Sequence, residues 1–366
     1  MTRINWNEPK FDEQDLEEVS KVIKVSYINE GPKTKELEES FKKYLNVKYV
    51  IPTTNATAGL FLALKADSLI KQKNDFEVIV PDMTMIATAT SVNWAGGKPV
   101  IVDVENERGT INVKEITKKI NKKTMAIIPV HILGRGVNMT ELEKIALDND
   151  LTIIEDAAGA LGSKDSNGKY LGTIGKIGVF SLQSNKIVTC GQGGIIVTND
   201  EKYYEVIRRL RDFGRINNKE FIHLIEGYNL KFNDLSAALA LSQFKKIELR
   251  KKMLLNQREL YKKELDNNQK LRFFPYKGEE IPLWVDVITD DRNGLVRYLN
   301  KHNIYPRECW PALHMNPPYK NQGDDATFPI STYISKNTLW LPNGPSISNE
   351  QIVYISQKIK EFYDGT

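Results

Sequence analysis

The sequence predicts an α/β protein with a doubly wound, mostly parallel sheet followed by a smaller α+β unit. Short apolar runs alternate with helical stretches between about residues 49 and 198, which is typical of strand–helix repeats. The runs are apolar throughout, as strands are when helices cover both faces of a sheet. The length of 366 residues exceeds what one hydrophobic core usually fills, so two domains are expected.

The first part is expected to contain seven strands, the earlier of which are separated by helices. Two amphipathic helices, 11–25 and 34–44, precede these strands, with a Gly31-Pro32 break between them. The expected strands are 49–52, 77–80, 99–102, 125–129, 152–155, 177–181 and 195–198, and the expected helices are 57–65, 86–94, 113–120 and 140–148.

The second part begins after a long amphipathic stretch, 233–265, which is expected to connect two domains. We place the boundary near Lys245, giving a large domain 1–245 and a small domain 246–366. The small domain is expected to contain a strand at 283–287, a helix at 292–302, a loop rich in proline and aromatic residues at 305–319 and a final helix at 349–363.

The composition excludes several classes of protein. A net charge of +4, from 51 basic and 47 acidic residues, gives no argument for nucleic acid binding. No apolar run is long enough to cross a bilayer, and the acidic N-terminus is not a signal peptide. Two cysteines offer no disulfide framework and four histidines no metal-ligand spacing, so a cytoplasmic protein without a metal is expected.

Two charged residues stand at the ends of expected core strands. Asp156 follows the apolar run Ile153–Ile154, and Lys186 lies between the strand 177–181 and a glycine-rich turn. Taken singly, such an aspartate is more often a helix cap and such a lysine a solvated surface charge. Together they suit pyridoxal 5′-phosphate (PLP), because a buried amine is nucleophilic and a carboxylate keeps the pyridine nitrogen protonated.

A phosphate site is expected where residues 52–59, PTTNATAG, join a strand to a helix. Small and hydroxyl residues at a helix start leave backbone N–H groups for an anion, although they also serve as ordinary caps. Ser181 is a second candidate donor, whereas Gly191–Gly194 lacks the pattern of a phosphate loop and is interpreted as a turn behind Lys186.

Two histidines are candidate site residues. His131 ends a strand, where a lone histidine is more often structural than catalytic. His314 lies in the loop CWPALHMNPPY beside Trp310 and Tyr319, a composition that suits a sugar or nucleotide and equally a packed surface loop.

These motifs, taken in order, resemble the DegT/DnrJ/EryC1/StrS family of PLP-dependent nucleotide-sugar aminotransferases over essentially the whole chain. The markers are NEGPKTKELEESFKKYL, TTNATAGLFLAL, GGKPVIVDV, IIPVHILGRGVNM, IIEDAAGALGS, GVFSLQSNKIVTCGQGG, GYNLKFNDLSAALALSQ and WPALHMNPPY. The resemblance implies the aspartate-aminotransferase (type I) fold, and perosamine-synthase-like members look nearest.

The resemblance also implies residue roles. Lys186 would form the Schiff base, and Asp156 would contact the pyridine nitrogen. Asn229 would reach the phosphate of the neighbouring subunit, which implies a homodimer with shared active sites. Ala56, Thr57 and Ser181 would hold the phosphate, Met85 would pack on the cofactor ring, and His314, Trp310 and Lys231 would face the substrate.

Five positions depart from the family pattern. Gly159 replaces a glutamine, histidine or glutamate, and Met85 replaces an aromatic ring that stacks on the cofactor. Both changes are expected to enlarge or soften the pocket. Ala56, Gln192 and Lys231 replace a glycine, a glutamate and an arginine.

The resemblance implies amino transfer from glutamate, which leaves as 2-oxoglutarate, to a nucleotide-linked 4-keto-6-deoxyhexose for a polysaccharide or glycan. The alternatives are a 3-keto sugar, an inosose or a small phosphorylated ketone as acceptor. A PLP-dependent sugar dehydratase is disfavoured because such relatives carry histidine in place of Lys186. A non-catalytic scaffold is disfavoured because Lys186 and Asp156 are both present.

Overall fold

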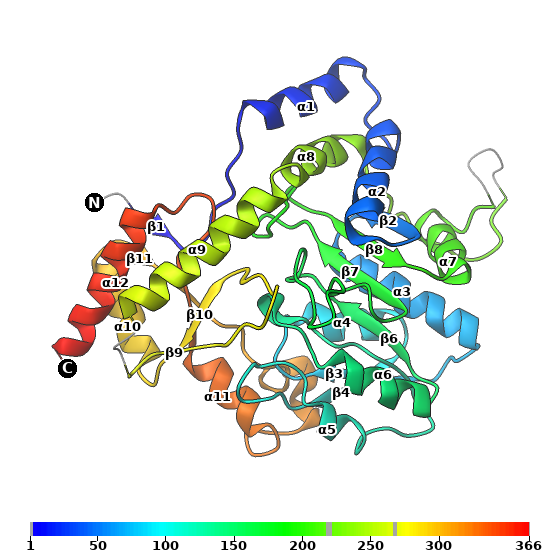
Figure 1. The fold of residues 1–366 in the computed structure, drawn as a ribbon. Helices are drawn as coiled ribbons and strands as arrows, with labels where there is room; N and C mark the ends of the chain where they lie inside the picture. Colours follow the sequence, from blue (N-terminus) through cyan, green and yellow to red (C-terminus); the bar gives the residue numbers. More distant parts are fainter. Residues whose placement is uncertain (1–2, 217–221, 266–268, 366) are drawn as a thin grey trace.

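The computed structural model describes residues 3–216, 222–265 and 269–365, and a seven-stranded sheet forms its centre (Figure 1). The strand order is β2-β8-β7-β6-β5-β3-β4, and β8 runs antiparallel to both of its neighbours while the other pairs are parallel. All seven strands lie within two residues of their predicted ends, and the mostly parallel α/β architecture is confirmed. They are β2 (Tyr49–Thr53), β3 (Glu77–Pro81), β4 (Lys98–Val102), β5 (Thr124–Ile127), β6 (Thr152–Asp156), β7 (Ile177–Ser181) and β8 (Gly194–Thr198).

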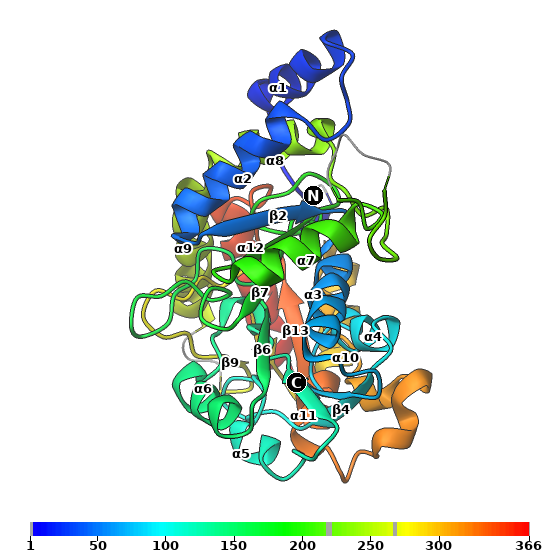
Figure 2. The same cartoon turned by 90° about the vertical axis from the view of Figure 1, so that its right-hand side faces the viewer.

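Neighbouring residues of one strand face different helical layers, which explains why the strands are apolar throughout. In β8, Ile196 packs in an apolar cluster with α3, whereas Ile195 and Val197 pack in a second cluster with α2 and α8. Figure 2 shows α3 and α4 on one side of the sheet and α6 on the other. The helices that follow the strands are α3 (Ala56–Lys71), α4 (Ala87–Trp94), α5 (Val113–Ile116), α6 (Met139–Asp148) and α7 (Glu201–Arg211).

One predicted helix is shorter than expected. The helix predicted over 113–120 ends as α5 at Ile116. The Thr117 hydroxyl donates to the carbonyl of Lys114 at 3.2 Å, and a turn closed by the Thr124 amide and the Asn121 carbonyl leads directly into β5. A threonine that bonds to the preceding turn offers the backbone an alternative to further helix.

Helices α1 (Glu13–Lys24) and α2 (Pro32–Leu45) pack against α8 (Asp234–Phe244). The Asp234 carboxylate accepts the amides of Gly31 and Thr34, both at 2.9 Å, and so caps a helix two hundred residues earlier in the chain. The stretch predicted as continuous over 233–265 is two helices, because α8 ends before α9 (Ile247–Leu265) begins. The predicted domain boundary falls at this break, where we continue to propose it.

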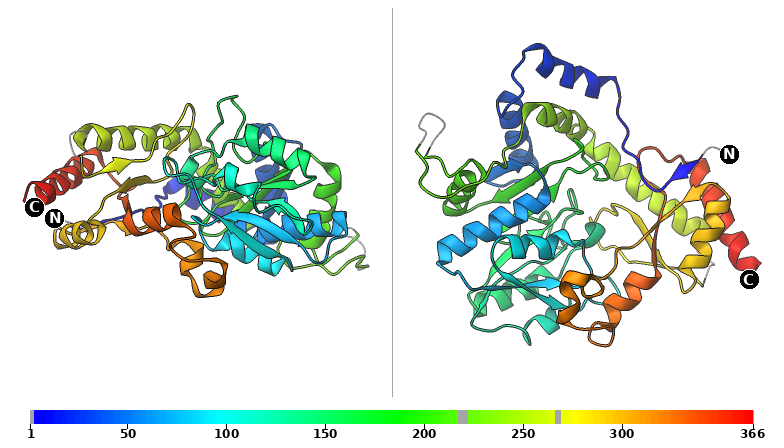
Figure 3. Two further views of the ribbon diagram at one scale, coloured as in Figure 1. Left: turned by 90° about the horizontal axis from the view of Figure 1, so that it is seen from below. Right: turned by 180° about the vertical axis from the view of Figure 1, so that it is seen from behind.

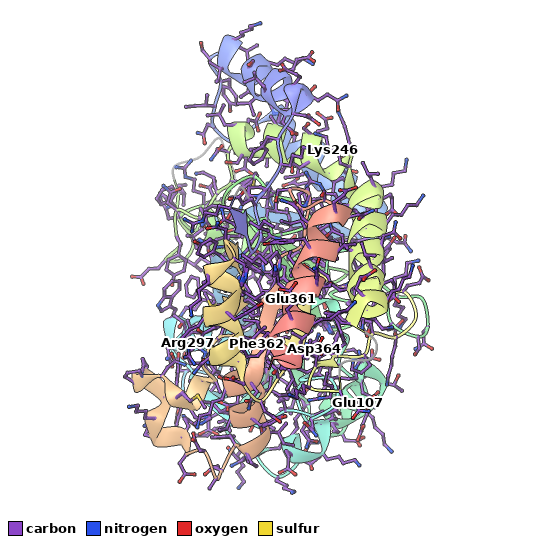
Figure 4. The ribbon with its side chains drawn as sticks, turned by 90° about the vertical axis from the view of Figure 1, so that its left-hand side faces the viewer. Glu107, Lys246, Arg297, Glu361, Phe362 and Asp364 are labelled. Carbon is purple, nitrogen blue, oxygen red and sulfur yellow. The ribbon has the colours of Figure 1, made fainter. Side chains whose placement is uncertain are left out.

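A second sheet, of four antiparallel strands in the order β12-β13-β10-β9, forms most of the C-terminal part. The predicted strand 283–287 corresponds to β10, and the other three strands were not predicted. Figure 4 shows α12 between α9 and α10, where the hydroxyl of Tyr298 donates to Glu361 at 3.2 Å. These elements are β9 (Arg272–Phe273), β10 (Val285–Ile288), α10 (Arg292–Lys301), β12 (Arg307–Glu308), α11 (Pro329–Asn337), β13 (Thr338–Leu341) and α12 (Asn349–Asp364).

The N-terminal residues lie with this C-terminal part. Strand β1 (Ile4–Asn5) pairs in parallel with β11 (Ile304–Tyr305), and Figure 3 shows the first and last described residues at the same end of the molecule. Because β1 is anchored there, Trp6 enters the space between the two sheets. The loop predicted at 305–319 contains β12 and the 3₁₀ turn Leu313–Met315. In the described ranges, no helix combines the length and apolar character needed to span a membrane.

Candidate active site at the carboxyl ends of the strands

A cavity of about 380 Å³ opens at the carboxyl ends of β6 and β7, beside the second sheet. In open α/β sheets this edge is where ligands bind, and the volume lies in the range of small-molecule sites. Seven of the ten side chains predicted for the site line this cavity. They are Ala56, Thr57, Met85, Asp156, Ser181, Lys186 and Trp310.

Asp156 ends β6 as a buried carboxylate. Its Oδ2 accepts the hydroxyl of Thr88 at 2.8 Å, and its Oδ1 accepts the amide of Ala158 at 3.2 Å. Burial raises the pKa of this carboxyl, and the hydrogen bond from Thr88 partly offsets the rise. In the described chain no cationic nitrogen lies within 4 Å of it. A protonated pyridine nitrogen would supply the missing positive partner, so the residue fits PLP.

Lys186 lies half-buried on the loop after β7 and lines the cavity. Burial lowers the pKa of its amine to about 8, and the Asp156 carboxylate opposes part of that shift. Its Nζ lies 5.2 Å from the ring centroid of Trp284. A substantial fraction of this amine is therefore neutral near pH 8, which is the form that attacks an aldehyde.

This pKa gives a prediction for the PLP-free protein. We expect the rate at which Lys186 combines with PLP to rise from about pH 6 to pH 8 and to level off above it, whereas an ordinary lysine would keep gaining reactivity toward its pKa of about 10.4. Stopped-flow absorbance over this range measures the rate. A rate that still climbs steeply above pH 9 would contradict the lowered pKa.

The predicted phosphate site is the start of α3. Ala56 and Thr57 are its first two residues, whose amides have no acceptor within the helix, while Asn55 caps the helix by accepting the amide of Ala58 at 2.8 Å. Ser181 ends the neighbouring strand β7 and also lines the cavity. The helix start and this hydroxyl converge on one space, an arrangement suited to a phosphate.

Gly194 allows β8 to pass directly against this helix start. A Cβ at Gly194 would lie 2.5 Å from the carbonyl of Asn55 and 2.8 Å from the nitrogen of Ala56. A side chain is therefore excluded by backbone atoms that belong to the phosphate site. The turn Gly191–Gly194 supports the site by this close approach.

We expect Gly194→Ala to weaken PLP binding by about tenfold or more and to lower the free energy of unfolding by about 1–3 kcal/mol, because the added methyl displaces the start of α3. Equilibrium titration with PLP and urea unfolding measure the two effects. Native PLP affinity in a variant that has lost stability would show that Gly194 supports the sheet alone.

Thr88 was missed by sequence reasoning. Its hydroxyl donates a hydrogen bond to Asp156 and accepts one from the Thr84 hydroxyl, which lies 2.9 Å away. Thr84 lies in the bend before α4, and Thr88 lies four residues later in the first turn of that helix. That spacing is the only sequence signal for the pair, and it is a weak one.

We expect Thr88→Val to lower kcat about tenfold, because a hydrogen bond to a charged group contributes about 1.5–3 kcal/mol and its loss raises the pKa of Asp156 further. The pH profile of kcat should shift upward in the same variant. Thr88→Ser should restore most activity, and Thr90→Val on the same helix is the matched control. An unchanged pH profile would contradict the assigned role.

His131 also lines the cavity, and its position is fixed by Glu155, which does not line the cavity. Its Nε2 lies 2.7 Å from Glu155, whose carboxylate also accepts the amides of Gly172 at 2.7 Å and Ile174 at 2.6 Å. The backbone amide of His131 donates to the carbonyl of Asp156 at 3.0 Å. Successive carboxylates on β6 thus face opposite ways, and Glu155 with His131 fixes the strand end that carries Asp156.

Three predicted residues lie outside the cavity. His314 is buried, with Nδ1 2.6 Å from Asp82 and Nε2 3.1 Å from Asp325, so both of its nitrogens are already engaged. Lys231 pairs with Asp212, and Asn229 forms a β-bridge with the same residue. A substrate contact from His314 or Lys231 would therefore require these contacts to break.

The departures at Gly159 and Met85 have different consequences. A Cβ at Gly159 would lie 3.3 Å from the nitrogen of Leu133, so the turn at Leu133 already occupies the adjoining space. Gly159 itself lines the cavity, and the expectation that it enlarges the pocket stays a prediction. Met85 lines the cavity and is 48% exposed, so the cavity is open to solvent beside this residue.

Comparison with known proteins adds independent information. The sequence model of the DegT/DnrJ/EryC1/StrS aminotransferase family matches residues 9–360. The chain is 31% identical to GDP-perosamine synthase of Escherichia coli O157:H7 over 99% of both chains, and 29% identical to that of Vibrio cholerae over 98% of both.

Solved structures with this fold include the aminotransferase PseC of Helicobacter pylori, which takes part in pseudaminic acid biosynthesis. It aligns with a TM-score of 0.92, 22% identity and full coverage of both chains. DesI, determined in the presence of its TDP-sugar product, aligns with a TM-score of 0.90 and 24% identity over 99% of this chain and 93% of its own. The chain belongs to the DegT/DnrJ/EryC1/StrS aminotransferase family and is a PLP-dependent aminotransferase with the type I fold.

Proposed function

We propose that this enzyme moves an amino group from glutamate to the keto group of a nucleotide-linked sugar, most directly a 4-keto-6-deoxyhexose. The observation that carries the proposal is the match to two GDP-perosamine synthases over almost the entire chain. The cavity supports it, because Lys186 and Asp156 lie beside space for a further ligand that is lined by aromatic rings.

Each site residue has a defined task in this proposal. Bound PLP supplies an electron-accepting ring that stabilises negative charge on a substrate carbon. Asp156 holds a proton on the ring nitrogen, and Thr88 orients that carboxylate. The amine of Lys186 removes and returns the proton on the reacting carbon, for which a pKa near 8 suits work close to neutral pH. Ser181 and the start of α3 hold the phosphate.

We also propose a homodimer in which each subunit completes its partner's site. Met85 and Trp94, which both line the cavity, are 48% and 61% exposed. Large apolar side chains gathered at a site opening are typical of an interface. Asn229 lies outside its own cavity, which suits a residue that serves the neighbouring one.

Mixing two inactive variants tests this arrangement. Lys186→Ala and Asn229→Ala, unfolded and refolded together in equal amounts, should recover about a quarter of native activity, because half of the dimers are mixed and each carries one intact site. Each variant refolded alone is the control, and light scattering gives the mass. A monomer, or no recovery in a mixed dimer, would refute the shared site.

A substrate panel tests the reaction itself. With glutamate as donor, we expect turnover of a nucleotide-linked 4-keto-6-deoxyhexose at least about a hundredfold faster, in kcat/KM, than of a 3-keto sugar, an inosose or a phosphorylated small ketone. Coupled detection of 2-oxoglutarate measures each rate. Activity restricted to the small ketones would overturn the proposal while leaving the aminotransferase assignment intact.

A further inference from the structure

All five tryptophans of the chain line the cavity, although they come from distant parts of the sequence. Four of them form a continuous surface that we call the tryptophan wall: Trp6, Trp284, Trp310 and Trp340. The ring centroids of Trp6 and Trp284 are 4.7 Å apart, those of Trp284 and Trp340 4.6 Å, and those of Trp310 and Trp340 4.7 Å. Trp284 and Trp340 are almost fully buried by these edge-on and tilted contacts and Trp310 is half-buried, so the cluster gives the cavity a rigid apolar edge.

The wall is assembled by both ends of the chain. Trp284 precedes β10 and Trp340 lies on β13, while Trp6 follows β1 and is held by a hydrogen bond from the amide of Asn343 to its carbonyl at 3.0 Å. The pairing of β1 with β11 fixes Trp6 in this position. The N-terminal residues are thereby part of the cavity.

Arg307 stands at the exposed end of the wall. Its guanidinium carbon lies 5.1 Å from the Trp6 ring centroid, and its residue on β12 pairs with Trp340 of β13. The neighbouring Arg292 is paired with Glu308 at 3.0 Å, whereas within the described ranges no carboxylate oxygen lies within 4 Å of Arg307. Arg307 therefore presents an unpaired positive charge to the cavity that it lines.

Two nitrogen groups lie against neighbouring rings of the wall. Lys186 lies over Trp284 and Arg307 over Trp6, and the centroids of these two rings are 4.7 Å apart. A matching ligand has a reacting carbonyl for Lys186, an apolar part beside the rings and an anionic group for Arg307. A keto-hexose linked to a diphosphate has all three features, whereas glutamate has no apolar ring face.

On the basis of the proposed function, we propose that the tryptophan wall binds the apolar face of the sugar and that Arg307 binds its diphosphate. A guanidinium forms two parallel hydrogen bonds to phosphate oxygens, and its position over the Trp6 ring orients the plane in advance. Trp6 and Arg307 are then specificity-determining residues for the sugar substrate.

Nucleoside diphosphate binding tests the anion site without turnover. GDP and dTDP are titrated into the holoenzyme, and the fluorescence of the cavity tryptophans reports occupancy. We expect Arg307→Gln to raise the dissociation constant about tenfold or more and Arg307→Lys to raise it by less, because lysine keeps the charge and loses the paired geometry. Arg297→Gln, on exposed α10, is the matched control.

The two half-reactions separate the sugar from the amino donor. In Arg307→Gln and Trp6→Leu, we expect the KM for the keto-sugar to rise about tenfold, with much smaller changes in the KM for glutamate, and Trp6→Phe to recover most of the loss. A change confined to glutamate would show that Arg307 binds the donor carboxylate and would overturn the proposal. Unchanged binding and kinetics in Arg307→Gln would also overturn the proposal, because they would show that Arg307 is only a solvated surface charge.

Failure of the proposed function gives a different result. If the native enzyme reacts with glutamate but binds neither nucleoside diphosphate, the proposed substrate class is wrong, and the result does not depend on any variant. If the native enzyme binds them and Arg307→Gln binds them equally well, only the assignment of Arg307 is wrong.

Discussion

Lys186→Ala is expected to remove the visible absorption band of bound PLP and to lower the transamination rate by at least about 10²–10⁴-fold, the usual contribution of a positioned acid–base group. The variant loses both the covalent attachment and the amine that moves the substrate proton. Absorbance spectroscopy of the purified protein and the rate of 2-oxoglutarate formation measure the two effects separately.

Lys169→Ala is the control for this variant, because Lys169 is exposed and does not line the cavity. It should keep the native spectrum and rate. Since the half-buried Lys186 amine forms no ion pair within the described residues, its removal should not unfold the protein, and the circular dichroism of Lys186→Ala should match that of the native chain. Residual activity above a tenth of native would contradict the assignment.

The central sheet was predictable because its strands carry their own signal. Residues such as Ile154 and Val179 are buried whichever way they face, so a purely apolar run identifies the strand without knowledge of its neighbours. Lys186 and Asp156 were found for a related reason. Each follows such a run, and the carboxyl ends of parallel strands meet at one edge.

The missed parts depend on contacts between distant segments. Strands β9 and β12 are two residues long, too short for a periodic pattern, and exist because β10 and β13 are already aligned. Trp6 reaches the cavity only through the pairing of β1 with β11, three hundred residues away. No local pattern encodes such a placement.

His314 shows the opposite failure. Its loop has the composition of a sugar site, but Asp82 lies after β3 and engages the imidazole and the backbone amide of His314 together. Composition correctly placed the loop near the cavity through Trp310, and could not decide which of its side chains faces inward. The same loop thus supplies one cavity residue and one anchor.

The second large effect is expected for Asp156→Asn. An amide cannot hold a proton on the pyridine nitrogen, so the ring accepts electrons less readily, and kcat should fall by about 10²–10³-fold, as when a charge-stabilising group is removed. The Lys186 amine is still present, so the band of bound PLP should persist with a shifted maximum. Loss of the band together with activity would show that Asp156 mainly holds the fold.

The stability of the PLP-free protein provides an independent check on the direction of the Asp156 pKa shift. Burial raises the pKa of Asp156, so the folded protein holds this proton more tightly than the unfolded chain does. Its contribution to stability is then most favourable below the unfolded value of about 3.9 and is lost as the pH rises through the folded pKa.

At pH 7 the PLP-free Asp156→Asn protein should therefore unfold at a higher urea concentration than the native PLP-free protein. With PLP bound, the order should reverse, because the charged carboxylate then has its cationic partner; a variant less stable in both forms would argue that the carboxylate is already compensated within the chain.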